Sequence, residues 1–247
     1  MAVNLDKCSS EFIGILIGDG HLHYSDMPGK RKNYYVSISG SLSEDLAYHK
    51  NHVRLLFYKL FKEDIRILRQ RHDEILTKKH SKKIVALLNE RFQIPIGNKT
   101  STCRVPEIIK NTNKTFKSRF LRGLADTDFS LMFKDKGSGK HTYPTIRIGF
   151  KSLKLVEDIY DMLKGFDFRF GKIIKEKYYD IRSNKKTIKY SIYIYGKKNL
   201  EKWMKEIGFK NDKHITKYLI WKRFGHCPIR TTLKKRQQIL SQKFIVS

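Results

Sequence analysis

The sequence predicts an α+β protein in which one αββαββα half-domain occurs twice. Three observations lead to this prediction. The same order of apolar and alternating segments recurs along the chain, and each copy opens with a short apolar segment ending in an aspartate. Gly14 and Gly123 are 109 residues apart, and so are Asp19 and Asp128. This period is too long for a solenoid repeat, so it suits two half-domains.

The first copy opens with an apolar helix that ends at Asp19 and Gly20. Val36 and Ile38 alternate with polar residues, which is typical of a half-buried strand. Ser43 is expected to cap the next helix, because a serine hydroxyl can accept a hydrogen bond from a first-turn amide. The predicted segments are helix 11–20, a strand from 21, strand 34–39, a helix from 43 to 60, strands 65–69 and 74–77, and helix 81–92.

The second copy repeats this order, and the tail after it has no counterpart in the first half. The predicted segments are helix 119–128, strands 129–134 and 145–150, helix 152–163, strands 171–179 and 187–195, and helix 198–207. We therefore divide the chain into half-domains 1–97 and 116–213, a linker 98–115 that contains Pro106, and a basic helical tail 214–247. The run Lys234-Lys235-Arg236 in this tail is expected to be solvated.

The charge predicts a polyanionic partner. The chain has 52 Lys and Arg against 24 Asp and Glu, a net charge of +28, while 40% hydrophobic residues suffice for a core. A field of this size argues against a small neutral substrate. The cations are spread along the chain and no apolar run reaches membrane-spanning length, so no membrane partner is expected. Cys8, Cys103 and Cys227 are widely spaced and no signal peptide is visible, which favours an intracellular, reducing compartment, either cytoplasm or an organelle.

The two apolar helices also suggest chemistry. Gly14 and Gly123 lack a Cβ, so helices that carry them can cross with their backbones nearly touching. Such a crossing would place Asp19 and Asp128 side by side, which is costly unless divalent cations bridge them. Two carboxylates beside a phosphodiester would form a Mg²⁺ site for phosphoryl transfer.

The segments FIGILIGDG (12–20) and LRGLADTDF (121–129) resemble the two motifs of a single-chain LAGLIDADG homing endonuclease. The resemblance covers roughly residues 10–213. It implies a pseudo-two-fold monomer with two saddle-shaped antiparallel sheets and a central pair of crossing helices. It also implies that Asp19, Asp128 and the carbonyls of Gly18 and Thr127 bind Mg²⁺ or Mn²⁺. Family positions for a catalytic lysine fall on Lys151, Lys99 and Lys213, and the first-half stretch that matches Lys151, Gly40-Ser41, contains no lysine.

Two residues of the second motif depart from the first. Asp126 stands where the first motif has Ile17, so a structural role is expected for it. Phe129 stands where the family usually has glycine. We expect Phe129 to begin the next strand and to pack with Leu131 and Phe133.

Strand alternation predicts the DNA-facing surface, because one parity packs under the helices and the other faces outward. Cationic, hydroxyl and aromatic side chains suit groove and phosphate contacts. The predicted DNA-binding residues are His21, His23, Ser25, Tyr35, Ser37, Ser39, Arg69, Arg71 and Lys78 in the first half, Ser130, Met132, Lys134, Thr145, Arg147, Lys175, Lys177, Lys189, Ser191 and Tyr193 in the second, and the loop cations Lys30, Arg31, Lys32, Lys136 and Lys140.

These observations favour a monomeric endonuclease that cuts both strands of a long asymmetric site in double-stranded DNA. Two alternatives stay open at this point. The first is an RNA maturase, whose partner would be a host intron RNA. The second is a LAGLIDADG protein that binds without cutting. The presence of both Asp19 and Asp128 favours retained cleavage.

Overall fold

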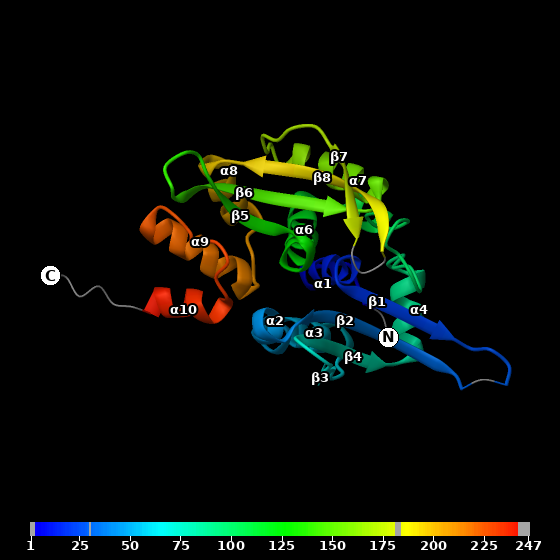
Figure 1. Cartoon of the computed structure of the whole chain (residues 1–247). Helices are drawn as coiled ribbons and strands as arrows, with labels where there is room; N and C mark the ends of the chain where they lie inside the picture. Colours follow the sequence, from blue (N-terminus) through cyan, green and yellow to red (C-terminus); the bar gives the residue numbers. More distant parts are fainter. Residues whose placement is uncertain (1–2, 30, 181–183, 242–247) are drawn as a thin grey trace.

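The computed structural model describes residues 3–29, 31–180 and 184–241. Their strands form two four-stranded antiparallel sheets, in the orders β1-β2-β4-β3 and β5-β6-β8-β7 (Figure 1). Helices α1 and α6 lie between the two sheets. The predicted duplicated α+β architecture is therefore confirmed. No helix in the described ranges is long and apolar enough to cross a membrane.

The first half follows the predicted order with two differences. Its elements are α1 (Lys7–Ile17), β1 (Gly20–Ser25), β2 (Asn33–Ser41), α2 (Leu42–Tyr48), the π-helical turn η1 (His49–Val53), α3 (Arg54–Phe61), β3 (Arg66–Arg69), β4 (Glu74–His80) and α4 (Lys82–Glu90). The predicted helix 43–60 is thus interrupted by η1. The prediction that Ser43 caps it is wrong: Ser41 accepts the Glu44 amide hydrogen bond, and Ser43 binds Asp73 through its amide (2.8 Å) and its hydroxyl (2.8 Å).

The second half repeats the pattern. After the short helix α5 (Glu107–Lys110), its elements are α6 (Lys114–Asp128), β5 (Ser130–Asp135), β6 (His141–Phe150), α7 (Leu153–Gly165), β7 (Ile174–Asp180), β8 (Lys185–Tyr195) and α8 (Lys197–Glu206). The predicted linker 98–115 contains the short helix α5 and the first two residues of α6. Strand β7 begins three residues later than predicted.

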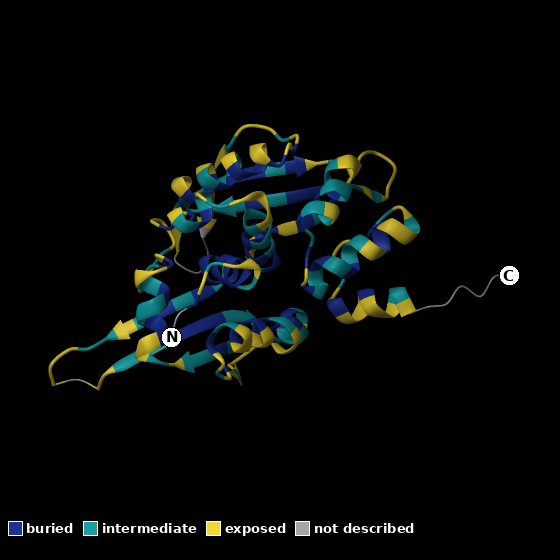
Figure 2. Ribbon diagram, turned by 180° about the vertical axis from the view of Figure 1, so that it is seen from behind, coloured by how far each residue is buried: buried dark blue, intermediate teal, exposed yellow. Residues whose placement is uncertain are grey.

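The contact between α1 and α6 depends on the two motif glycines. A Cβ added to Gly14 would lie 2.1 Å from the carbonyl oxygen of Phe120, and one added to Gly123 would lie 2.1 Å from that of Glu11. Residues 9–17 of α1 are all buried (Figure 2). The Glu11 carboxylate, in this buried contact, binds Arg122 of α6 and His52 of η1. Only glycine permits this backbone approach, so the motif glycines set the distance between the halves.

The tail forms two helices that connect the halves, α9 (Asp212–Phe224) and α10 (Leu233–Ser241). The expectation that Lys234-Lys235-Arg236 is solvated is wrong for Arg236, which is 1% exposed. Its guanidinium binds Glu44 of α2 at 2.6 Å and Thr216 of α9 at 2.9 Å. The tail thus fastens the second half to the first.

Candidate active site and nucleic-acid interface

The two motif aspartates lie at the ends of the crossed helices. Asp19 follows Gly18, the C-cap of α1, and Asp128 is the last residue of α6. A Cβ added to Gly18 would lie 2.0 Å from Thr127 Oγ1 and 2.3 Å from Asp128 Oδ2. The missing side chain at position 18 therefore lets the Asp128 carboxylate reach the end of the first motif.

The surroundings of the two carboxylates disfavour their ionised forms. Burial raises the pKa of Asp19, and the negative charge of Asp128 raises it further. The Asp128 side chain is partly open to solvent, yet the protein around it limits its hydration and raises its pKa as well. Positive charge from Lys99 and Lys213 opposes both shifts. A cation between the carboxylates would relieve the same repulsion.

The lysines predicted near the acids converge on this site. Lys99 Nζ donates to the carbonyl oxygens of Ile17 and Gly18, each at 2.8 Å. Lys213 Nζ donates to the Thr127 carbonyl at 3.2 Å. Lys151 lines a cavity of about 290 Å³ together with Lys99 and Asp128. The structure thus brings all three lysines to the ends of the crossed helices.

Asp45, at the start of α2, is part of the site but was missed by the sequence analysis. It is buried, forms an ion pair with Lys213 at 3.2 Å, and accepts a hydrogen bond from the Asn211 amide group at 2.7 Å. Its charge contributes to the raised pKa of Asp19. In the sequence Asp45 has the pattern of a first-turn helix acid, so no local signal distinguished it.

Asp126 and Phe129 have structural roles. Asp126 is fully buried and accepts hydrogen bonds from the backbone amides of Lys210 and Asn211, which fixes the segment that carries Lys213. Phe129 is buried, and its ring lies against Phe150 and Trp203. Its φ of −82° is an ordinary backbone conformation, so the phenylalanine introduces no strain after Asp128.

The donor atoms fit Mg²⁺ or Mn²⁺. Carboxylate and carbonyl oxygens are the ligands that Mg²⁺ prefers, and it usually keeps several waters and binds substrate phosphates. In the described part of the chain, no group of three or more His, Cys, Asp or Glu side chains could hold a metal ion. Asp19 and Asp128, with the carbonyls of Gly18 and Thr127, would therefore supply a partial ligand set that leaves room for substrate oxygens.

The uncovered face of the first sheet follows from the strand register. His21, Ser37, Lys78 and Arg66 lie opposite one another across the four strands. The face also holds His23, Ser25, Tyr35 and Ser39, as predicted. Lys78 Nζ lies 3.6 Å from the centre of the Tyr35 ring, and the His23 ring stacks on Tyr35 at 4.8 Å.

Three first-half predictions need correction. Arg69 lies opposite Ile75, whose side chain is buried under the helices, so Arg69 belongs to the other face; Arg66 was missed. Ser37 is on the predicted face but is only 4% exposed. Arg71 lies in the turn between β3 and β4.

Arg31 and Lys32 are exposed in the hairpin loop, where Lys32 pairs with Asp26 at 3.0 Å. Lys30 lies outside the described residues.

The second sheet presents a comparable face with one acid in it. Glu176 of β7 accepts hydrogen bonds from Arg147 and Tyr193, each at 2.5 Å, and from Ser191 at 3.0 Å. Lys189 lies opposite Glu176 on the same face. The remaining predicted residues on this face are Ser130, Met132, Lys134 and Thr145, while Lys136 and Lys140 are exposed in the β5–β6 loop.

The prediction that Lys175 and Lys177 share this face is wrong. They lie opposite Tyr190 and Ile188, so they point away from the face of Lys189 and Tyr193. Thr145 and Ser191 are on the predicted face, but both are fully buried. Small side chains on a sheet are covered by longer side chains on either side of them. Strand alternation therefore placed Thr145 and Ser191 on the right face, although neither is exposed.

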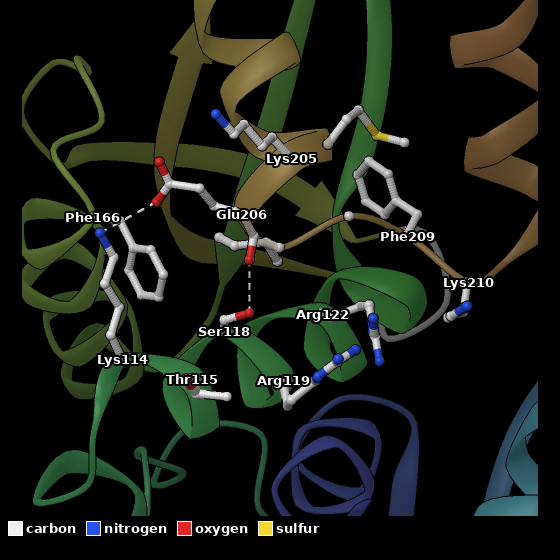
Figure 3. Close-up of a pocket in the computed structure, with 13 residues that line it drawn as sticks. Lys114, Thr115, Ser118, Arg119, Arg122, Phe166, Lys205, Glu206, Phe209 and Lys210 are labelled. Carbon is white, nitrogen blue, oxygen red and sulfur yellow. Dashed lines mark hydrogen bonds and ion pairs between the residues drawn. The ribbon is translucent and has the colours of Figure 1, made fainter. Parts of the chain in front are cut away.

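A second cavity, of about 640 Å³, lies at the other end of α6 (Figure 3). It is lined by Lys114, Arg119 and Arg122 of α6 and by residues of α8 and the loop after it. Lys114 pairs with Glu206 at 3.3 Å, and Ser118 donates to the Glu206 carbonyl at 2.8 Å. None of the lining residues belongs to the carboxylate site, so the two cavities are distinct.

Comparisons with known proteins agree with this architecture. Residues 115–208 match the family model described as "LAGLIDADG-like domain". An alignment of 134 residues that covers 51% of the chain is 30% identical to the tRNA-splicing ligase RtcB of Methanopyrus kandleri, and the match spans 13% of that protein's length.

Three homing-endonuclease structures resemble most of the fold. A structure of I-DmoI in complex with DNA and Mn has a TM-score of 0.58 at 22% identity, with 83% of this chain and 98% of that chain covered. I-SmaMI gives 0.54 at 12% identity, with 91% of each chain covered. I-LtrWI, a LAGLIDADG homing endonuclease bound to target DNA, gives 0.52 at 14% identity, with 90% of each chain covered. The protein therefore contains a LAGLIDADG-like domain in its second half, and over 83–91% of its length the chain has the fold of these single-chain LAGLIDADG homing endonucleases.

Proposed function

We propose that the protein is a divalent-metal-dependent, site-specific endonuclease that cuts both strands of double-stranded DNA. One observation carries the proposal: Asp19 and Asp128 lie at adjoining ends of the crossed helices α1 and α6, their charges interact, and these helices lie between two sheets that each have an uncovered face (Figure 1). A duplex lying along both faces would pass over the two carboxylates. The solved structures of I-DmoI with DNA and Mn and of I-LtrWI with target DNA support this reading.

Different residues of the site would bind the metal, stabilise the reacting phosphate and hold the duplex. Asp19, Asp128 and the carbonyls of Gly18 and Thr127 would hold Mg²⁺ or Mn²⁺. When bound, the metal activates water and stabilises the leaving oxygen of the phosphodiester. Lys99, Lys213 and Lys151 place positive charge around the reacting phosphate. Arg147, Tyr193, Tyr35 and Lys78 on the two sheets bind and orient the duplex.

The two sheets carry different side chains, so the target is expected to be asymmetric and the active protein monomeric. The first face gathers His21, His23 and Tyr35, whereas the second carries Arg147 and Lys189 around Glu176. A monomer with two unlike faces reads unlike half-sites, in contrast to the palindrome that a homodimer reads.

The three free cysteines, Cys8, Cys103 and Cys227, suit a reducing intracellular compartment.

Cleavage of a plasmid library in Mg²⁺ or Mn²⁺ tests the proposal, with the wild type beside Asp19→Asn and Asp128→Asn. We expect the wild type to make a unique double-strand cut that each variant loses. Duplex binding should persist in both variants, because each removes negative charge. Absence of a cut in any divalent ion, with tight duplex binding retained, would leave a binding-only protein. Preference for intron RNA over duplex DNA would instead indicate a maturase.

A further inference from the structure

Lys189 of β8 lies beside Asp128 in a space that a glycine provides. Both residues line the cavity of about 290 Å³ that also holds Lys99 and Lys151, and their charges interact. The Lys189 side chain crosses Gly149 of the neighbouring strand. A Cβ at position 149 would lie 2.3 Å from Lys189 Cε and 3.1 Å from its Nζ. The absence of a side chain at Gly149 therefore lets the lysine lie across β6 beside Asp128.

Among the residues whose side chains the structure describes, none forms a carboxylate ion pair with the Lys189 ammonium, although the charges of Lys189 and Asp128 interact. Glu176 lies directly opposite Lys189 on β7, but its oxygens bind Arg147, Ser191 and Tyr193. The lysine is only partly exposed, so its position is confined by its neighbours. A confined, unpaired ammonium beside the carboxylate of a phosphodiesterase site is suited to bind a phosphate oxygen.

The first half has no matching cation. In the first sheet His21 lies opposite Ser37, and Ser37 opposite Lys78; in the second, Ser130 lies opposite Arg147, and Arg147 opposite Tyr193. His21 and Ser130 each follow their aspartate by two residues. Counting along the strands from these matched rows places Ser39 at the position of Gly149 and Glu74 at the position of Lys189. An acid and a hydroxyl thus stand where the second half has a lysine and a glycine.

We propose that Lys189 is a phosphate-binding residue of the half-site around Asp128, holding the phosphodiester that is cut there, with no counterpart in the first half. The inference rests on the proposed endonuclease function. It adds that the two strand cuts depend unequally on one side chain. The charge of Lys189 stabilises the phosphate in only one half-site, so its loss slows one strand cut and leaves the other.

The test compares Lys189→Met with Lys186→Met, a control on the same strand whose side chain lies on the opposite face. Each strand of a target duplex carries a different end label, and both cuts are timed in Mg²⁺. We expect Lys189→Met to slow one strand about 10²-fold, so that nicked duplex accumulates, and Lys186→Met to cut as the wild type does. Gly149→Ala keeps the lysine but displaces it, so it should give the same bias, and adding it to Lys189→Met should cause no further loss.

A second readout needs no cleavage. Binding of the duplex is measured in Ca²⁺ over a range of salt concentrations. Losing one phosphate contact should reduce the slope of log K against log salt by roughly 0.9 for Lys189→Met and leave it unchanged for Lys186→Met. Equal slowing of both strands, or an unchanged slope, would overturn the assignment. A wild type that binds but cuts neither strand would refute the endonuclease function, while the slope would still decide whether Lys189 binds phosphate.

Discussion

The ammonium of Lys99 donates a hydrogen bond to the carbonyl oxygen of Gly18, with the two atoms 2.8 Å apart. Lys213 makes the same kind of contact with the carbonyl of Thr127 at 3.2 Å. Each lysine follows the last helix of its own half and reaches the carbonyl that immediately precedes a motif aspartate. The two lysines thus occupy equivalent positions around the pseudo-two-fold axis.

Replacing either lysine with methionine should reduce cleavage by about 10²-fold, because in the proposed reaction each would place a positive charge where negative charge develops on the reacting phosphate. Duplex affinity in Ca²⁺ should change little, since the many other cations on the two sheets would still bind the DNA phosphates. Single-turnover cleavage and equilibrium binding measure the two effects. Lys198→Met, on the exposed side of α8, is the control. Cleavage at the wild-type rate in both variants would show that the two lysines only hydrogen-bond the carbonyls at the helix ends and take no part in cleavage.

The repeated glycines and aspartates predicted the fold and the centre of the site. The glycines allow a close helix crossing, and the aspartates at the helix ends supply the acidic groups there. The strand faces were harder. The strand segments Arg66–Arg69 and Ile174–Asp180 carry apolar and charged residues on both faces, so alternation gave no signal, and Arg69, Lys175 and Lys177 were misplaced. Only the pairing register assigns them.

The contacts of Arg236 and Asp45 were also out of reach of the sequence. Arg236 is buried because it binds Glu44, which is 192 residues away in the chain. Asp45 meets Asn211 from 166 residues away. Pairings over such separations leave no trace in local periodicity. From the sequence alone, Arg236 was therefore interpreted as part of a solvated basic run, and Asp45 as an ordinary acid in the first turn of a helix.

Gly123→Ala should destabilise the fold and impair cleavage together. The added methyl group would lie 2.1 Å from the carbonyl oxygen of Glu11, a backbone atom that can yield only if α1 and α6 separate. Overpacking of this kind costs about 1–3 kcal/mol. Urea denaturation gives the loss of unfolding free energy. Gly165→Ala is a matched control in α7, because nothing lies within 4 Å of its added Cβ, and it should leave the stability nearly unchanged. Equal stability of the two variants would contradict the close crossing.

Glu11→Gln should lower the unfolding free energy at pH 7 by about 3 kcal/mol, because it leaves Arg122 and His52 without their buried partner. Burial acts to raise the pKa of Glu11, but hydrogen bonds from His52 and Arg122 outweigh it and hold the pKa below its ordinary value of 4.5. The unfolded state therefore takes up this proton at a higher pH than the folded state. The stabilising contribution is complete above pH 4.5 and is lost as the pH falls through the folded pKa.

Denaturation of the Glu11→Gln variant at pH 7 and at pH 4 measures this dependence. The gap between wild type and variant should narrow at the lower pH. Glu63→Gln removes a partly exposed carboxylate paired with Lys79 at 2.6 Å and should cost less than about 1 kcal/mol at either pH. A gap that stays constant with pH would show that Glu11 contributes through packing rather than charge.

Arg236→Met should destabilise the protein by about 3 kcal/mol, because the buried guanidinium of α10 binds Glu44 of α2 and Thr216 of α9. The neighbouring Lys235 is exposed, so Lys235→Met should change the stability by less than about 0.5 kcal/mol. Chemical denaturation of the two variants side by side gives both values. If the two variants are equally stable, the tail does not fasten the halves together.

Arg66 and Arg69 lie at the two ends of β3, on opposite faces of the first sheet. Both are exposed, but Arg66 lies opposite Lys78 on the uncovered face, whereas Arg69 lies opposite Ile75 on the helix-covered side. Arg66→Ala should therefore weaken duplex binding and reduce the magnitude of the salt slope by about 1, while Arg69→Ala should leave the slope unchanged. Fluorescence anisotropy over a salt series measures both. A larger effect at Arg69 would mean that the duplex contacts the edge of the sheet rather than its uncovered face.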